Sequence, residues 1–246
     1  MAPAESTVIA IRNLHKAFGA KEVLRGVNIE VERGTSAVVM GGSGSGKSVL
    51  IKHLVQLFQP SDGEVWIFGE RMDQLEGDAL DQMRLRIGYL FQSGALFDSM
   101  DVYENMAFLL RRHTDLKEPE IADRIDETLT WVNLANTKQQ YPASLSGGQK
   151  KRIGLARSII LQPDIMLYDE PTTGLDPVSV RTVSELIVRL RDERGITSVT
   201  ITHDLLCAEI ITDRAHYLHQ GQILESGTLD ELQASASPVL RNFVGA

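Results

Sequence analysis

The sequence predicts an α/β fold in which helices cover a parallel β-sheet. Short apolar or β-branched stretches alternate along the chain with helical stretches, a pattern typical of parallel sheets covered on both faces. A segment of about residues 93 to 152 is helical instead, and we expect it to form an insert. The 246 residues, 43% of them apolar, suit one large α/β domain or two small lobes.

Strands and one helix are predicted in the first third of the chain. Val8–Arg12 and Val23–Val31 are rich in β-branched residues and alternate partly between apolar and polar, which predicts two strands. Ser36–Met40 is a short apolar run, consistent with a buried strand. A glycine-rich loop follows, and then a helix over Lys47–Phe58 and a strand over Glu64–Phe68.

Inside the predicted insert, residues 101–134 have a helical pattern. Four apolar residues share one helix face there; they are Ile121, Ile125, Leu129 and Val132. The alternation of strands and helices returns after the insert. The later predicted elements are strands Ile165–Tyr168 and Thr197–Thr202, a helix Val178–Arg191, a hairpin Arg214–Glu225 and a helix Pro238–Val244. We therefore divide a single domain, residues 1–246, into a core of about 1–92 and 153–227, a helical subdomain of about 93–152 and a tail of about 228–246.

Composition narrows the class of partners. The formal net charge is −8, whereas sequence-independent binding to nucleic acid usually goes with a basic balance, so we expect no nucleic-acid partner. Cys207 is the only cysteine, which excludes an internal disulfide and fits a reducing compartment. We expect no secretory signal, and no apolar run approaches the roughly 20 residues of a membrane helix. Work at a membrane would therefore need a partner that holds the protein there.

The first functional motif is a phosphate-binding loop. The pattern G-x-x-x-x-G-K-[ST] lies between a predicted strand and a predicted helix, the context that its mechanism requires. Glycines let backbone N–H groups face a triphosphate, and the start of the helix favours negative charge. Lys47 can reach the β- and γ-phosphates, and the Ser48 hydroxyl can bind Mg²⁺. The candidate nucleotide-binding residues here are Gly41, Gly42, Ser43, Gly44, Ser45, Gly46, Lys47, Ser48 and Val49.

Two carboxylates, Asp169 and Glu170, end a predicted buried strand. A carboxylate in that place is costly unless a cation or hydrogen-bond donors accompany it. Parallel strands gather their carboxyl ends at one edge of the sheet, beside the phosphate loop. We therefore expect Asp169 to hold Mg²⁺ and Glu170 to polarise the attacking water, although an acidic turn before Pro171 is the simpler alternative. The two motifs together are compatible with many classes of nucleotide hydrolase.

The pentapeptide Leu145–Gln149, Leu-Ser-Gly-Gly-Gln, resembles the signature sequence of ABC ATPases. Its serine and glycines would begin a helix whose N-terminus can receive an anion. The resemblance covers essentially the whole chain and implies the P-loop ABC ATPase fold: a RecA-like parallel sheet, an N-terminal antiparallel β subdomain and a helical insert carrying the signature. It further implies contacts with the γ-phosphate of ATP held by the opposite subunit, made by Ser146, Gly147, Gly148 and Gln149.

Other elements of the family occur in the family's order. Phe18 lies where an aromatic ring stacks on adenine, and Gln92 matches a glutamine that reaches Mg²⁺ and the attacking water. His203 matches a switch histidine that contacts the γ-phosphate, and Asp176 belongs to a loop that crosses the dimer interface. A lone histidine or phenylalanine is more often structural, so the shared order carries these assignments. The resemblance thus implies catalytic roles for Gln92, Glu170 and His203.

One chain would hold one phosphate-loop half-site and one signature half-site. The resemblance therefore implies a second copy of the chain, paired head to tail around two ATP molecules with Mg²⁺. It also implies integral membrane permease subunits, and a peripheral position at the cytoplasmic face of the inner membrane. ATP would close the dimer, and hydrolysis would reopen it.

The stretch after the glutamine indicates the subtype. Ser93–Asn105 and Leu109–Leu116 resemble the MlaF-type ATPases of Mla/Mce phospholipid transporters. That likeness implies lipid transport, with a lipid-binding Mce/MlaD-like subunit and a small cytoplasmic accessory subunit as further partners. Leu96, Phe97 and Met100 can form an apolar surface for a permease helix, although plain packing within the insert explains them equally well.

One stretch departs from the family pattern. Lys150-Lys151-Arg152 follows the signature at positions where glutamines are commoner. Two alternatives therefore stay open: the ATPase of an importer for another solute, and a non-transport ABC regulator such as a cell-division ATPase.

Overall fold

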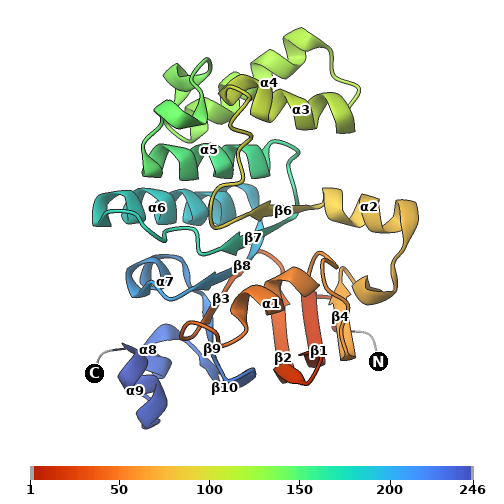
Figure 1. Cartoon of the computed structure of the whole chain (residues 1–246), viewed down its shortest axis with the longest axis vertical. Helices are drawn as coiled ribbons and strands as arrows, with labels where there is room; N and C mark the ends of the chain where they lie inside the picture. Colours follow the sequence, from red (N-terminus) through yellow and green to blue (C-terminus); the bar gives the residue numbers. More distant parts are fainter. Residues whose placement is uncertain (1–2, 245–246) are drawn as a thin grey trace.

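Two β-sheets organise the chain, which a computed structural model describes over residues 3–244 (Figure 1). The central sheet has the strand order β10-β9-β3-β8-β7-β6, and the second sheet the order β2-β1-β4-β5. The central strands are β3 (Ser36–Met40), β6 (Ile87–Leu90), β7 (Ile165–Asp169), β8 (Thr197–Thr202), β9 (Arg214–His219) and β10 (Gln222–Gly227). The second sheet contains β1 (Thr7–Phe18), β2 (Lys21–Glu32), β4 (Asp62–Ile67) and β5 (Glu70–Arg71).

The central sheet is parallel except for its last hairpin. β3 pairs in parallel with β8 and β9, and β7 pairs in parallel with β6 and β8. Every residue of β3, β7 and β8 is buried, as expected of strands covered on both faces. Alternate side chains enter different cores: Val38 and Met40 pack with the helices, whereas Ala37 and Val39 face the second sheet. The α/β prediction is confirmed.

Nine α-helices lie in the described residues, and residues at their ends explain where some of them begin and stop. They are α1 (Lys47–His53), α2 (Gly77–Leu85), α3 (Val102–His113), α4 (Glu118–Trp131), α5 (Gly147–Ile159), α6 (Pro177–Arg194), α7 (Leu205–Ile211), α8 (Leu229–Gln233) and α9 (Pro238–Val244). α6 shows the signals at both ends, because Asp176 accepts hydrogen bonds from the first turn and Gly195 adopts the left-handed conformation that stops it. No helix described in residues 3–244 is long and apolar enough to cross a membrane.

The helical segment lies at one end of the molecule, and the second sheet lies at the other (Figure 1). α3 and α4 pack on each other, and α5 connects them to the core by packing on β6 and α6. α5 therefore runs across residue 152, where we placed the end of the helical subdomain.

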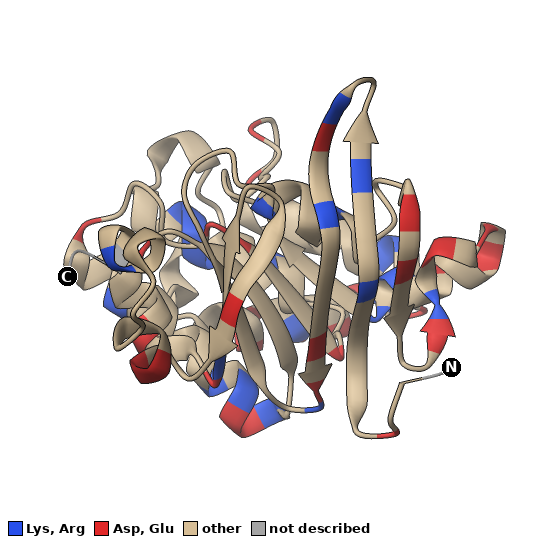
Figure 2. Cartoon of the chain, turned by 90° about the horizontal axis from the view of Figure 1, so that it is seen from below, with Lys and Arg blue, Asp and Glu red and all other residues tan. Residues whose placement is uncertain are grey.

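Basic and acidic residues are interspersed along the strands in the view of Figure 2.

Several boundaries differ from the sequence prediction. α1 ends at His53 rather than Phe58, because the chain turns there and Gln56 takes a positive φ of 51°. β1 extends beyond Arg12, since it pairs with β2 across several bulges. The sequence did not predict α2, whose only buried residue is Met83, nor the four-residue β6. The β9–β10 hairpin, the apolar face of α4 and the helix Pro238–Val244 are confirmed.

Candidate functional site

A cavity of about 850 Å³ lies where the phosphate loop meets the carboxyl ends of β7 and β8. Segments far apart in the sequence line it: Phe18, Lys21, Val23, residues 42–49, Gln92, Glu170, His203 and Phe243. Most residues that the sequence singled out for the phosphate-loop side of the site are therefore neighbours in space. A cavity at the carboxyl ends of parallel strands is the usual place for a ligand in an open α/β sheet.

The glycines of the loop permit close approach of two strands. A Cβ on Gly46 would lie 2.9 Å from Leu24 Cδ2, and the residue has a φ of +109°. A Cβ on Gly41 would lie 2.2 Å from the carbonyl oxygen of Leu218. Side chains are therefore excluded at both positions, and the loop backbone is held against β2 and β9.

Lys47 fixes the loop from inside. Its Nζ donates to the carbonyl oxygens of Gly41 at 2.6 Å and Gly42 at 3.1 Å, and lies 3.9 Å from Glu170 Oε1. Burial lowers the pKa of Lys47, although the nearby carboxylates oppose that shift. The Ser45 hydroxyl is buried within the loop and has no hydrogen-bond partner among the described residues.

Asp169 ends β7 beside the loop. Its carboxylate accepts from Tyr89 Oη at 3.1 Å and from Ser48 Oγ at 3.5 Å. Burial raises the pKa of Asp169, which a cation at this place would reverse. Hydroxyl and carboxylate oxygens are the ligands that Mg²⁺ prefers. Within residues 3–244 no three or more His, Cys, Asp or Glu side chains are grouped so that they could hold a metal ion, so phosphate and water oxygens would complete such a site.

Glu170 is held in one orientation at the cavity. Its φ of 51° is unusual for a residue with a side chain, and its N–H donates to Ile201 O at 2.9 Å. The carboxylate accepts from Thr173 Oγ1 at 3.0 Å and from His203 Nδ1 at 2.9 and 3.0 Å. The backbone and three side-chain contacts thus fix the direction of the Glu170 carboxylate at the cavity.

Phe18 and Gln92 lie at the rim. The Phe18 ring is 44% exposed at the end of β1, and its edge-on partner is Phe58 with 5.3 Å between centroids. The ring lines the cavity, and Lys16 Nζ lies 5.0 Å from its centroid. Gln92 follows β6, is exposed and lines the same cavity.

The signature residues form a second group. Ser146 Oγ accepts from Gln149 N at 3.2 Å, and Gln149 Oε1 accepts from Ser146 N at 2.8 Å, so the serine caps α5. A Cβ on Gly148 would lie 2.9 Å from Ser179 Oγ. That serine is bound to Asp176 at 2.6 Å. Neither the residues 146–149 nor Asp176 belong to the described lining of the cavity.

Sequence reasoning missed three contacts at the site. Tyr89 supports Asp169, Thr173 supports Glu170, and Phe243 of α9 reaches the rim of the cavity. Tyrosine and threonine are common in sheet proteins, so neither carries a signal by itself. Phe243 lies in a helix that the sequence did predict, but nothing in its pattern connects that helix with the loop.

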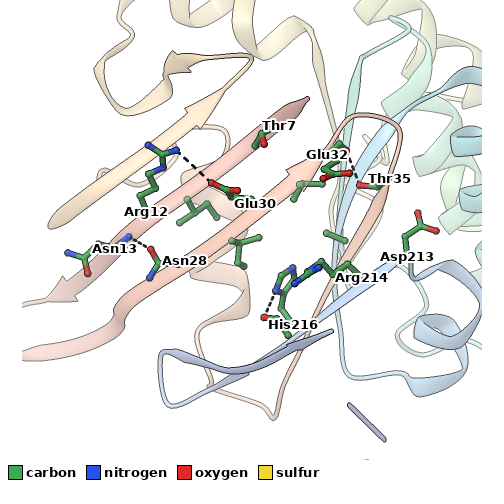
Figure 3. Close-up of a pocket in the computed structure, with 15 residues that line it drawn as sticks. Thr7, Arg12, Asn13, Asn28, Glu30, Glu32, Thr35, Asp213, Arg214 and His216 are labelled. Atoms are coloured by element: carbon green, nitrogen blue, oxygen red, sulfur yellow. Dashed lines mark hydrogen bonds and ion pairs between the residues drawn. The ribbon is translucent and has the colours of Figure 1, made fainter. Parts of the chain in front are cut away.

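A second cavity of about 780 Å³ lies between β1, β2 and β9 (Figure 3). None of the residues that the sequence proposed for function lines it. His216 is its most buried polar group: Nδ1 lies 2.8 Å from Ser226 Oγ, and Nε2 has no partner among the described residues. Burial lowers the pKa of His216 to about 4.

Residues 24–173 match the sequence family described as "ABC transporter". Over 96% of its length the chain is 38% identical to the probable ribonucleotide transport ATP-binding protein mkl of Mycobacterium leprae and 37% identical to TRIGALACTOSYLDIACYLGLYCEROL 3 of Arabidopsis thaliana. It spans 68% and 73% of these two proteins. It is also 34% identical to the methionine import ATP-binding protein MetN of Campylobacter jejuni, with 97% of this chain and 76% of that protein covered.

Solved structures agree with these relatives. The dimeric post-hydrolysis state of the ATP-binding cassette MJ0796, bound to ADP and Pi, superposes with a TM-score of 0.82 at 30% identity, covering 90% of this chain and 98% of that one. The structure of cbiO1 from Clostridium perfringens, part of the ABC transporter complex cbiONQ, superposes with a TM-score of 0.86 at 29% identity, covering 94% and 92%.

Proposed function

This chain belongs to the ABC transporter family and is an ATPase, and from that premise we propose that it drives a lipid transporter of the Mla/Mce type. Two copies would clamp two ATP molecules and act on permease subunits in a membrane. The protein would then sit peripherally at the cytoplasmic face of that membrane, held by the permease.

The observation that carries the paired mechanism is the separation of two groups of residues. The phosphate loop, Glu170 and His203 surround one cavity, whereas Ser146 caps an exposed helix start outside its lining. In a head-to-tail dimer the exposed helix start of each copy can complete the cavity of the other, because the same surface serves both halves. The dimeric cassette that the chain superposes on supports this arrangement.

Each residue then has a role in hydrolysis. The loop N–H groups and Lys47 would bind the phosphates, and Ser48, Asp169 and Gln92 would hold Mg²⁺, which neutralises charge on the transferred phosphoryl group. Glu170 would accept the proton of the attacking water. His203 keeps that carboxylate oriented through Nδ1, and its ring, 58% exposed, is free to meet the γ-phosphate. Phe18 would stack on the adenine base.

A groove beside the glutamine loop supports a permease partner. It has a volume of about 340 Å³ and includes Tyr89, Phe91 and Leu109 in its lining. Phe97 and Phe108 lie near it with 5.8 Å between their ring centroids, and each is 41% exposed. Exposed aromatic rings around a groove suit the apolar face of a helix. We therefore place the permease contact here.

One of the reported relatives supports lipid as the cargo. The Arabidopsis relative carries the name of a galactolipid, whereas the mycobacterial relative is named for ribonucleotide transport. A lipid-binding Mce/MlaD-like subunit and a small accessory subunit would complete the lipid machine. Import of another solute is the second candidate, because MetN proteins named for methionine import match at 34 to 38% identity.

Purification from native membranes tests both candidates. We expect a tagged chain to bring down a permease, a lipid-binding subunit and phospholipid, measured by mass spectrometry. Recovery of a permease with a solute-binding protein and no lipid would support the importer, and recovery of no permease would refute the transporter proposal. Phe97→Asp should reduce permease recovery about tenfold, whereas Leu224→Asp, at an exposed apolar residue of β10, should not.

A further inference from the structure

Lys151 is a buried cation that the mechanism above does not use. It lies near the start of α5, is 7% exposed, and directs its ammonium group into the protein. Nζ donates to the carbonyl oxygen of Gln92 and, at 3.0 Å, to that of Glu170. Its hydrogen-bond acceptors are thus two main-chain carbonyls, one on each of two residues that face the nucleotide cavity.

Burial of an ammonium group is unfavourable unless hydrogen-bond acceptors or opposite charges compensate for its lost hydration. Burial lowers the pKa of Lys151, with Glu170 and Asp169 opposing the shift. An apolar side chain would fill the same position without that cost. The charge is therefore better explained by the two segments that it joins, which lie 59 and 19 residues away in the sequence.

Both segments need external support. Gln92 lies in an irregular stretch between β6 and α3, in which Gly94 and Ala95 have positive φ values of 78° and 50°. Glu170 also has a positive φ, 51°, so its carbonyl and its carboxylate are held by contacts rather than by regular structure. One ammonium group bonded to both carbonyls fixes the distance between the glutamine loop and the catalytic carboxylate.

The same helix holds the loop at two further points. Arg157 Nη1 donates to the carbonyl oxygen of Ala95. A Cβ on Gly154 would lie only 3.0 Å from Gly94 Cα, so the helix and the loop pack backbone to backbone. Ser146 of the signature is the N-cap residue of α5. The helix that starts with the signature is thus bonded directly to the loop and the carboxylate of its own chain.

We propose that Lys151 is a positioning residue that joins the signature helix, the Gln92 loop and the Glu170 backbone into one unit. When the signature of one chain contacts the nucleotide bound to the partner copy, Lys151 of that chain holds its own Glu170 carboxylate in the position that hydrolysis requires. This inference rests on the proposed function, because it requires each signature to meet nucleotide on a second copy.

Three substitutions separate the charge, the hydrogen bonds and the packing. Lys151→Met keeps the length and removes the donors, and we expect kcat for ATP to fall about 10- to 100-fold with KM changed less than about threefold. Lys151→Arg keeps charge and donors and should recover kcat to within about fivefold of wild type. Lys151→Gln should lie between them. Lys150→Met, one position earlier and half-buried, is the matched control and should retain wild-type kcat.

A second measurement distinguishes an effect of Lys151 on closure of the dimer from an effect on hydrolysis. In a Glu170→Gln background, the ATP concentration that gives half-maximal dimer on size exclusion should change less than about threefold with Lys151→Met, because closure precedes the step that Lys151 supports. Thermal melting of each variant checks folding, and should Lys151→Met not fold, the arginine and glutamine variants decide. Unchanged kcat in Lys151→Met, or a raised KM with retained kcat, overturns the inference. Failure of the wild-type chain to hydrolyse ATP as a dimer overturns the proposed function instead.

Discussion

Lowering the pH from 7 to 5 should cost the native state about 2 kcal/mol through a single residue, His216. The imidazole is buried against β10, with Nδ1 bonded to Ser226 Oγ and Nε2 without a partner among the described residues. Desolvation comes first among the causes that lower its pKa from 6.5 to about 4, and the charge of Arg214 adds to it. The native state therefore keeps His216 neutral where the unfolded chain would protonate it.

The size and the pH window follow from that difference. Because the pKa is lower in the folded state, this contribution to stability is present above pH 6.5 and is lost as the pH falls toward 4. Each unit of separation corresponds to about 1.4 kcal/mol, so the loss reaches about 2 kcal/mol at pH 5 and about 3 kcal/mol at pH 4.

Urea unfolding at pH 7 and pH 5 measures the effect. His216→Asn can keep a hydrogen bond to Ser226 and cannot titrate, so its free energy of unfolding should fall about 2 kcal/mol less than that of wild type over this interval. His113→Asn, at an exposed position of α3, should leave the wild-type pH dependence unchanged. Equal slopes for wild type and His216→Asn would refute the reasoning.

Three further predictions concern the nucleotide site. Glu170→Gln should lower kcat by about 10²- to 10⁴-fold while ATP-bound dimers accumulate on size exclusion, and wild-type turnover would rule out the base assignment. Ser146→Arg should abolish hydrolysis but leave fluorescent ATP binding to the monomer within about threefold, whereas retained hydrolysis would argue against the paired site. Tyr89→Phe removes a 3.1 Å hydrogen bond to Asp169 and should raise the Mg²⁺ concentration for half-maximal hydrolysis about 10-fold, and an unchanged Mg²⁺ titration would contradict this role.

Strong local patterns made most of the fold predictable. β3, β7 and β8 are short apolar or β-branched runs, and their complete burial is what such runs indicate. A helix was predicted over Val178–Arg191, and in the structure α6 extends over Pro177–Arg194 with Asp176 and Gly195 at its ends. α2 was missed because it is short and its apolar face is narrow, with Met83 buried and Leu80 partly buried against the core.

The site was predictable where chemistry demands a fixed spacing. Gly46 and Lys47 belong to such a spacing, and the structure places both at the cavity. Tyr89 and Thr173 could not be found this way, since they support a carboxylate across strands and their partners depend on the register of the sheet. Lys151 was visible only as an unusual residue after the signature, because nothing in the sequence shows which carbonyls a buried lysine will meet.

The position of α5 also bears on how a conformational change driven by ATP would be transmitted to the permease. Arg157, about one and two-thirds helix turns beyond Lys151, donates to Ala95 O, and its guanidinium lies 4.7 Å from the centre of the exposed Phe97 ring. Arg157 also lines the groove proposed for the permease. A shift of α5 on closure of the dimer would therefore move the wall of that groove directly, because the helix is bonded to the loop rather than merely adjacent to it. The hydrogen bonds of Lys151 to Gln92 and of Arg157 to Ala95 tie the loop to the signature helix, and in the proposed transporter they would pass the motion of that helix to the permease groove.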